Sequence, residues 1–98
     1  MKLNREYSIK EIADLYHCTL SSDVDYKFNS ISSINKIENH SLIYISDTKH
    51  LSKLNSDIDC AILIAKDITL STRHAHIICD NPLFVFSRFL SDYLNSNN

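Results

Sequence analysis

The sequence predicts a small single α/β domain in which a mixed β-sheet is packed by about three helices. Three observations lead to this class. The 98 residues are enough for one domain, spanning residues 1–98. Apolar residues recur at helical spacing in residues 9–16 and 83–94. Residues 60–65 form a continuous apolar run, which is typical of a strand buried on both faces and often parallel to its neighbours.

The first half of the chain begins with a short strand at residues 6–8. A helix at residues 9–16 follows, because Ser8 and Glu11 have the spacing of a capping box, in which each satisfies a free backbone N–H of the other. The next predicted elements are a short strand at residues 18–21, a turn at 22–25, a strand at 26–32 and an irregular polar segment at 34–41.

The second half continues with a strand at residues 42–46. Asp47 is a candidate cap for a short helix at residues 48–54. The remaining elements are the buried strand at 60–65, a connection at 66–72, a strand at 74–79 and a helix at 83–94, which Asn81 caps and Pro82 opens. The inner stripe of that last helix is predicted to contain Phe86, Phe89, Leu90, Tyr93 and Leu94.

Composition excludes several classes of function. The formal net charge is −2 and no basic run exists, so the chain lacks the positive face of a nucleic-acid-binding protein. No apolar stretch is long enough to span a membrane and no secretory signal is apparent, so we expect a cytoplasmic protein. Cys18, Cys60 and Cys79 are widely spaced and odd in number. This favours buried reduced thiols over a disulfide or a zinc site.

Glycine is absent. A Walker loop and a dinucleotide-binding fingerprint both need glycine for close approach of the backbone to phosphate, so neither can be present. No serine can lie in a nucleophile elbow for the same reason. Turns that need a left-handed backbone are expected to use Asn, Asp or Ser. We expect no cofactor.

Two groups of titratable residues invite a functional interpretation, the histidines as metal ligands and the aspartates as a calcium or acid–base site. His74 and His76 would lie on one side of a strand and could present two ligands, or they are two polar positions on a solvated sheet face. The pairs Asp23/Asp25 and Asp57/Asp59 fall in predicted turns. Neither pair has the regularly spaced oxygen ligands of a calcium loop, and Asp is common in turns.

The stronger candidate is the strand-to-helix corner that contains Tyr44, Asp47 and His50. Two rings three residues on either side of a polar side chain could sandwich a flat heterocycle while that side chain binds its polar edge. Free backbone N–H groups at a helix start suit carbonyl or phosphate oxygen. The alternative is that Asp47 only caps the helix and Tyr44 belongs to the core.

Three segments carry a resemblance to a known family. They are "IKEIADL" with "CTL" at residues 9–20, "ISSI" at 31–34 followed by "LIYISDTKHLSKL" at 42–54, and "IICDNPLFVFSRFLSDYL" at 77–94. In order and spacing they resemble the UDP-3-O-acylglucosamine N-acyltransferases of lipid A biosynthesis in Gram-negative bacteria. The resemblance covers about residues 6–94.

The resemblance implies the N-terminal uridine-binding domain of such an enzyme. In that family a left-handed β-helix follows, which carries the catalytic histidine, the acyl-carrier-protein surface and the trimer contacts. That domain is missing here, so this chain alone is expected to bind UDP-acylglucosamine without catalysing acyl transfer. A small enzyme built on the histidines is a third, weaker hypothesis.

The family's corner has Phe, Asn and Tyr where this chain has Tyr44, Asp47 and His50. Both rings keep a stacking face. An ionised Asp only accepts hydrogen bonds, whereas Asn also donates one to a uracil carbonyl. A buried polar group without a partner costs about 1–3 kcal/mol. The affinity for uridine is therefore expected to be lower by roughly tenfold to a hundredfold, so that binding is weak or lost. The alternative function is a stand-alone interaction module that kept the fold.

Overall fold

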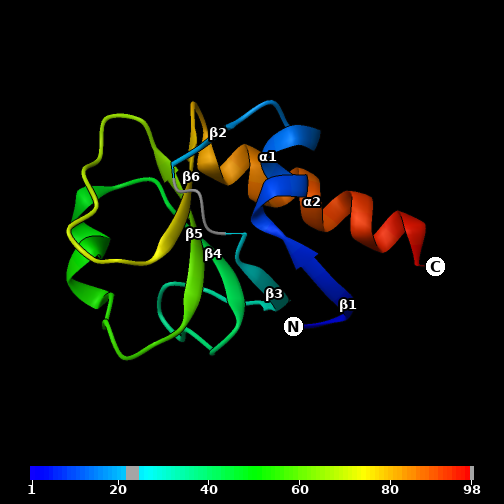
Figure 1. The fold of residues 1–98 in the computed structure, drawn as a ribbon, viewed down its shortest axis with the longest axis horizontal. Coiled ribbons are helices and arrows are strands. Elements are labelled where there is room, and N and C mark those ends of the chain that lie inside the picture. Colours follow the sequence, from blue (N-terminus) through cyan, green and yellow to red (C-terminus); the bar gives the residue numbers. More distant parts are fainter. Residues whose placement is uncertain (22–24, 98) are drawn as a thin grey trace.

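The computed structural model describes residues 1–21 and 25–97 (Figure 1). The predicted turn at 22–25 and the residue Asp23 therefore lie wholly or partly outside the described residues. The elements are strands β1 (Lys2–Ser8), β2 (Thr19–Leu20), β3 (Lys27–Ile31), β4 (Ser41–Ile45), β5 (Cys60–Ala65) and β6 (Ala75–Cys79), helices α1 (Ile9–Leu15) and α2 (Pro82–Ser96), and the 3₁₀ helix η1 (Thr48–Lys53). Their order along the chain is the predicted one.

The strands form one six-stranded mixed sheet in the order β1-β3-β4-β5-β6-β2. The four inner strands β3, β4, β5 and β6 are parallel. The two edge strands β1 and β2 are antiparallel to their neighbours. All six residues of β5 are buried, so the prediction of a central parallel strand at residues 60–65 is confirmed.

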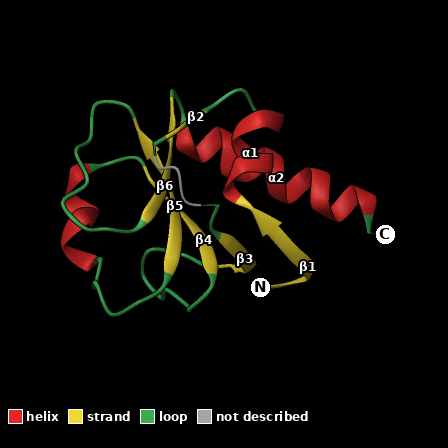
Figure 2. Cartoon of the chain, in the orientation of Figure 1, coloured by secondary structure: helices red, strands yellow, loops and turns green. Residues whose placement is uncertain are grey.

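Each face of the sheet buries its own apolar cluster. The helix-side cluster is centred on Phe28, Leu42, Leu63, Ile77 and Phe89 and includes the inner residues of α1. On the loop side, Ile43, Ile45, Cys60, Ile62 and Ile64 are covered by η1 and by apolar residues of the loops. Figure 2 shows α1 and α2 together on one side of the sheet, and the short coil of η1 on the other. The alternation of side chains along β4 and β5 separates the two clusters.

The predicted caps of both α-helices are confirmed. The Ser8 hydroxyl accepts the N–H of Glu11 at 3.1 Å, and the Glu11 carboxylate accepts the N–H of Ser8 at 2.8 Å. At α2 the Asn81 side chain accepts the N–H of Phe84 at 3.1 Å, and Pro82 occupies the first turn. Both helices therefore begin where their sequence-local hydrogen bonds dictate.

Two predicted details are wrong. Strand β1 begins at Lys2 rather than at residue 6, because an edge strand needs few apolar residues and only Leu3 within it is buried. On α2 the inner face includes Val85, whereas Leu94 is 44% exposed. The short helix predicted at residues 48–54 is confirmed as the 3₁₀ helix Thr48–Lys53, and Leu51 and Leu54 pack on the loop side of the sheet.

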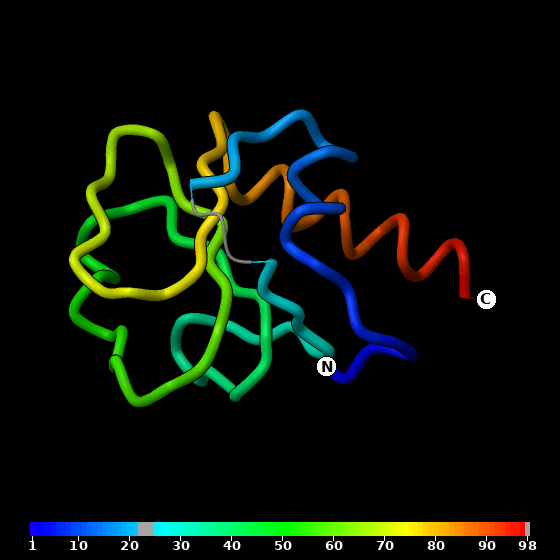
Figure 3. Tube along the Cα trace, viewed as in Figure 1, coloured from blue at the N-terminus to red at the C-terminus, as the bar shows by residue number. Residues whose placement is uncertain are grey.

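The left-handed backbone positions also differ from expectation. Among the described residues, His17 with φ 57° and His40 with φ 60° adopt positive φ, instead of Asn, Asp or Ser. His17 follows Tyr16, which ends α1, and the N–H of the next residue, Cys18, donates to the Ala13 carbonyl at 2.9 Å. This is a Schellman motif built without glycine. It turns the chain back toward the sheet, as the trace in Figure 3 shows.

Candidate functional site

The predicted corner lies where β4 ends at the carboxyl edge of the parallel strands. Asp47 caps η1, because its Oδ1 accepts the N–H of Lys49 at 3.0 Å and its carbonyl accepts the N–H of His50 at 3.2 Å. The predicted capping role is therefore confirmed. The second carboxylate oxygen of Asp47 makes no hydrogen bond within residues 1–21 and 25–97, so it is available to a donor.

The Tyr44 ring belongs to the helix side of the sheet. It is partly buried against the helix-side cluster, and its centroid lies 4.9 Å from that of Phe86 with the two rings tilted by 52°. One face of Tyr44 is thus covered by α2. Helix η1 packs on the opposite side of the sheet through Leu51 and Leu54. Tyr44 and the helix that carries His50 therefore lie on opposite faces of the sheet.

His50 has an unusual environment. Its side chain is partly buried, and its Nδ1 atom is buried without a hydrogen-bond partner among the described residues. Buried polar atoms are nearly always paired, and an unpaired one calls for an explanation. An imidazole nitrogen can either donate or accept, so the missing partner could be of either kind.

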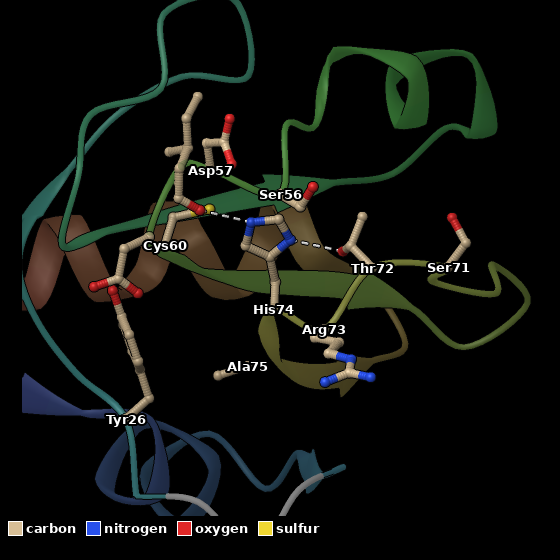
Figure 4. Close-up of a pocket in the computed structure, with 11 residues that line it drawn as sticks. Tyr26, Ser56, Asp57, Cys60, Ser71, Thr72, Arg73, His74 and Ala75 are labelled. Atoms are coloured by element: carbon tan, nitrogen blue, oxygen red, sulfur yellow. Dashed lines mark hydrogen bonds between the residues drawn. The ribbon is translucent and has the colours of Figure 1, made fainter.

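A concave region lies at the opposite, amino edge of the parallel strands. It has a volume of about 560 Å³ and is bounded by Tyr26 before β3, by residues 56–60 leading into β5, and by residues 71–75 leading into β6. We call it the amino-edge hollow (Figure 4). None of the three corner residues lines it. No periodic pattern in the sequence predicts the amino-edge hollow. It is formed by the loops before β5 and β6, which meet because these two strands are neighbours in the sheet.

His74 projects into this hollow with both ring nitrogens engaged (Figure 4). Its Nε2 lies 2.7 Å from the Ile58 carbonyl, which only accepts, so Nε2 carries the proton. Its Nδ1 lies 2.6 Å from the Thr72 hydroxyl. The ring therefore ties the loop before β6 to the loop before β5. A ring so occupied is a structural side chain rather than a free ligand or base.

The other polar groups of the hollow do not form a catalytic arrangement. Cys60 lines it, but burial, with a smaller effect of Asp59, raises the pKa of its thiol to about 11. The thiol is thus protonated at neutral pH and His74 has no free nitrogen to activate it. Among the described residues the buried Tyr26 hydroxyl has no partner in hydrogen-bond geometry, and burial together with the nearby Asp59 carboxylate raises its pKa. This side chain too stays protonated.

The proposed metal-binding groups are dispersed. His76 donates from Nδ1 to the His74 carbonyl at 3.0 Å, and both histidines are partly buried rather than fully solvated. Asp59 pairs with His40, Nδ1 to Oδ2, at 3.0 Å, while the Asp57 N–H donates to the Asn55 side chain within a turn. In the described part of the chain, no three His, Cys, Asp or Glu side chains converge on a common point where a metal ion could bind.

Comparison with known proteins adds no identification: no protein-family model matches the chain, and no curated protein matches it. The resemblance to the N-acyltransferases stays a prediction from the motifs quoted above. Among the residues described, no helix combines the length and the apolar character that crossing a membrane requires.

Proposed function

We propose that the chain is a non-catalytic uridine-binding domain of the UDP-3-O-acylglucosamine N-acyltransferase type, acting in the cytoplasm on a UDP-linked acylglucosamine. Catalysis and contact with acyl carrier protein would belong to a separate β-helix domain. The observation that carries the proposal is the corner at the carboxyl end of β4, where Asp47 and His50 each have a polar atom without a hydrogen-bond partner among the described residues.

Physical arguments favour that edge of the sheet. Ligands of open α/β sheets bind outside the carboxyl ends of parallel strands, because loops there are free to vary while the strands hold them in place. The free oxygen of Asp47 suits the N3–H donor of uracil. Tyr44 offers an aromatic ring, one face of which packs against Phe86 at a centroid distance of 4.9 Å. These groups suit binding and contain no nucleophile with a base.

The test is an NMR titration of the 98-residue chain with uridine monophosphate. Signals of residues 42–51 should shift more than those elsewhere, with affinity near the millimolar range, because only a few kcal/mol of contacts remain for the bare nucleotide. Asp47→Asn should tighten binding, since the amide supplies the donor that the carboxylate lacks.

The matched control is Asp57→Asn, which makes the same chemical change at an exposed aspartate of the amino-edge hollow. It should leave the affinity unchanged. Shifts confined to the hollow would move the site to the other edge of the sheet. If the nucleotide shifts no signal at the corner in either the wild type or Asp47→Asn, uridine binding is refuted.

A second candidate is a stand-alone interaction module. It is favoured by apolar side chains on the outer surface of α2, where Leu83 is 48%, Phe84 60% and Leu94 44% exposed. An isolated exposed apolar residue is ordinary, but Leu83 and Phe84 are adjacent in the first turn of α2, and grouped exposed apolar side chains are typical of a contact surface. The interaction module becomes the better account if uridine monophosphate shifts no NMR signals of the chain.

A further inference from the structure

The fold brings together two cysteines that lie 61 positions apart in the sequence, Cys18 and Cys79. Cys18 immediately precedes the edge strand β2, and Cys79 is the last residue of β6. The antiparallel register pairs Thr19 with Ile78 and Leu20 with Ile77. Continuing it by one residue places Cys18 directly opposite Cys79. Figure 1 shows β2 beside β6 at the end of the sheet near α1.

The hydrogen-bond pattern determines which kind of pair this is. The N–H of Ser21 donates to the His76 carbonyl at 3.4 Å, so Ser21 and His76 form a hydrogen-bonded pair. Pair types alternate along an antiparallel ladder, which makes Cys18 and Cys79 a non-hydrogen-bonded pair. Consistently, the N–H of Cys18 is directed to Ala13 in the Schellman motif. The Cα atoms of such pairs lie about 4.5 Å apart, within the range of about 4.4–6.8 Å found in disulfides.

Side-chain direction and burial agree with this placement. Directly opposite residues project from the same face of a sheet, and both cysteines contact the helix-side cluster. The register and the shared cluster make the two side chains neighbours. Burial, followed by the nearby Cys18 thiol, raises the pKa of Cys79. Cys18 is partly exposed and Cys79 is buried, whereas Cys60 belongs to the loop-side cluster across the sheet.

We propose that Cys18 and Cys79 are an oxidation site at which a low-molecular-weight disulfide forms a reversible cross-strand bond. The Cys18 thiolate, after losing its proton to solvent, attacks one sulfur of the small disulfide and releases one thiolate. The Cys79 sulfur, deprotonated in turn, attacks the Cys18 sulfur of the mixed disulfide and releases the second thiolate. Two protein thiols are oxidised, one small disulfide is reduced to two thiols, and the two protons are transferred to them.

The bond would change how the end of the sheet is held. Strand β2 is short, and its two residues Thr19 and Leu20 pair with β6. A covalent link at Cys18 would fasten β2 and the end of α1 to β6, immediately before the residues that cap α2. The oxidised form should therefore resist local opening of this edge, and its melting temperature should rise by on the order of 10 °C.

The experiment uses the whole chain incubated with mixtures of oxidised and reduced glutathione, followed by alkylation and mass spectrometry. The folded wild type should lose about two mass units, keep one alkylatable thiol, and yield a cross-linked peptide pair containing Cys18 and Cys79. Excess reduced glutathione should reverse the change. Cys60→Ala is the matched control and should form the same link.

Cys18→Ala should form no internal link. Circular dichroism of this variant establishes whether it is folded, and the wild-type mass measurement does not depend on it. The proposal is overturned if the wild type forms only glutathione adducts, if the link joins Cys60, or if a link between Cys18 and Cys79 appears only after unfolding in urea.

Discussion

Replacing Phe89 by Ala tests the helix-side core most directly. Phe89 is 3% exposed, and its ring centroid lies 5.2 Å from that of Tyr7 and 5.9 Å from that of Phe28. The change removes roughly 150 Å² of buried apolar surface, worth about 4 kcal/mol at about 25 cal/mol per Å². Measured Phe→Ala changes in cores cost about 3–5 kcal/mol, because the cavity collapses only in part.

The assay is urea unfolding followed by circular dichroism, from which the free energy of unfolding is extrapolated. The melting temperature should also fall, by roughly 15–30 °C for a domain of this size. Phe84→Ala is the matched control, because this residue occupies the same helix and is 60% exposed. It should change stability by less than about 1 kcal/mol. A loss below about 1 kcal/mol for Phe89→Ala, or equal losses in both variants, would contradict the placement of α2.

Three further predictions concern polar contacts. The Tyr16 hydroxyl donates to Asp92 at 2.7 Å, which with Arg88 lowers the pKa of Asp92. A carboxyl group whose pKa is lower in the folded state stabilises the fold at pH values above its unfolded-state pKa of about 3.9. This stabilisation is lost as the pH falls through the folded-state pKa. Tyr16→Phe should therefore lower the melting temperature at neutral pH, and the gap should narrow near pH 2; a constant gap would argue against this pairing. Asn81→Ala should cost about 1 kcal/mol in urea unfolding, through loss of the α2 cap; an unchanged midpoint would mean that the cap contributes nothing. His74→Ala should cost about 1–3 kcal/mol by leaving the Ile58 carbonyl unpaired, whereas stabilisation of the wild type by added zinc would favour the metal interpretation.

Much of the fold could be predicted because its causes are local. The capping residues Ser8, Asp47 and Asn81 satisfy N–H groups two or three positions away, so their sequence neighbours are sufficient to place the helix starts. The continuous apolar run of β5 indicates that this strand is buried on both faces. The beginning of β1 was missed because an edge strand with one buried residue has almost no apolar pattern.

The sequence by itself determined the order of the elements, both α-helix caps, the central strand and the exclusion of glycine-dependent phosphate loops. Only the tertiary structure decided which distant residues meet. Strand order placed Cys18 opposite Cys79 and brought the two loops of the amino-edge hollow around His74. It also set Tyr44 against α2, and η1 on the other side of the sheet. The periodicity of a segment indicates whether its residues are buried or exposed. Which residues pair across a sheet depends on the packing of all segments together, so no local pattern predicts these partners.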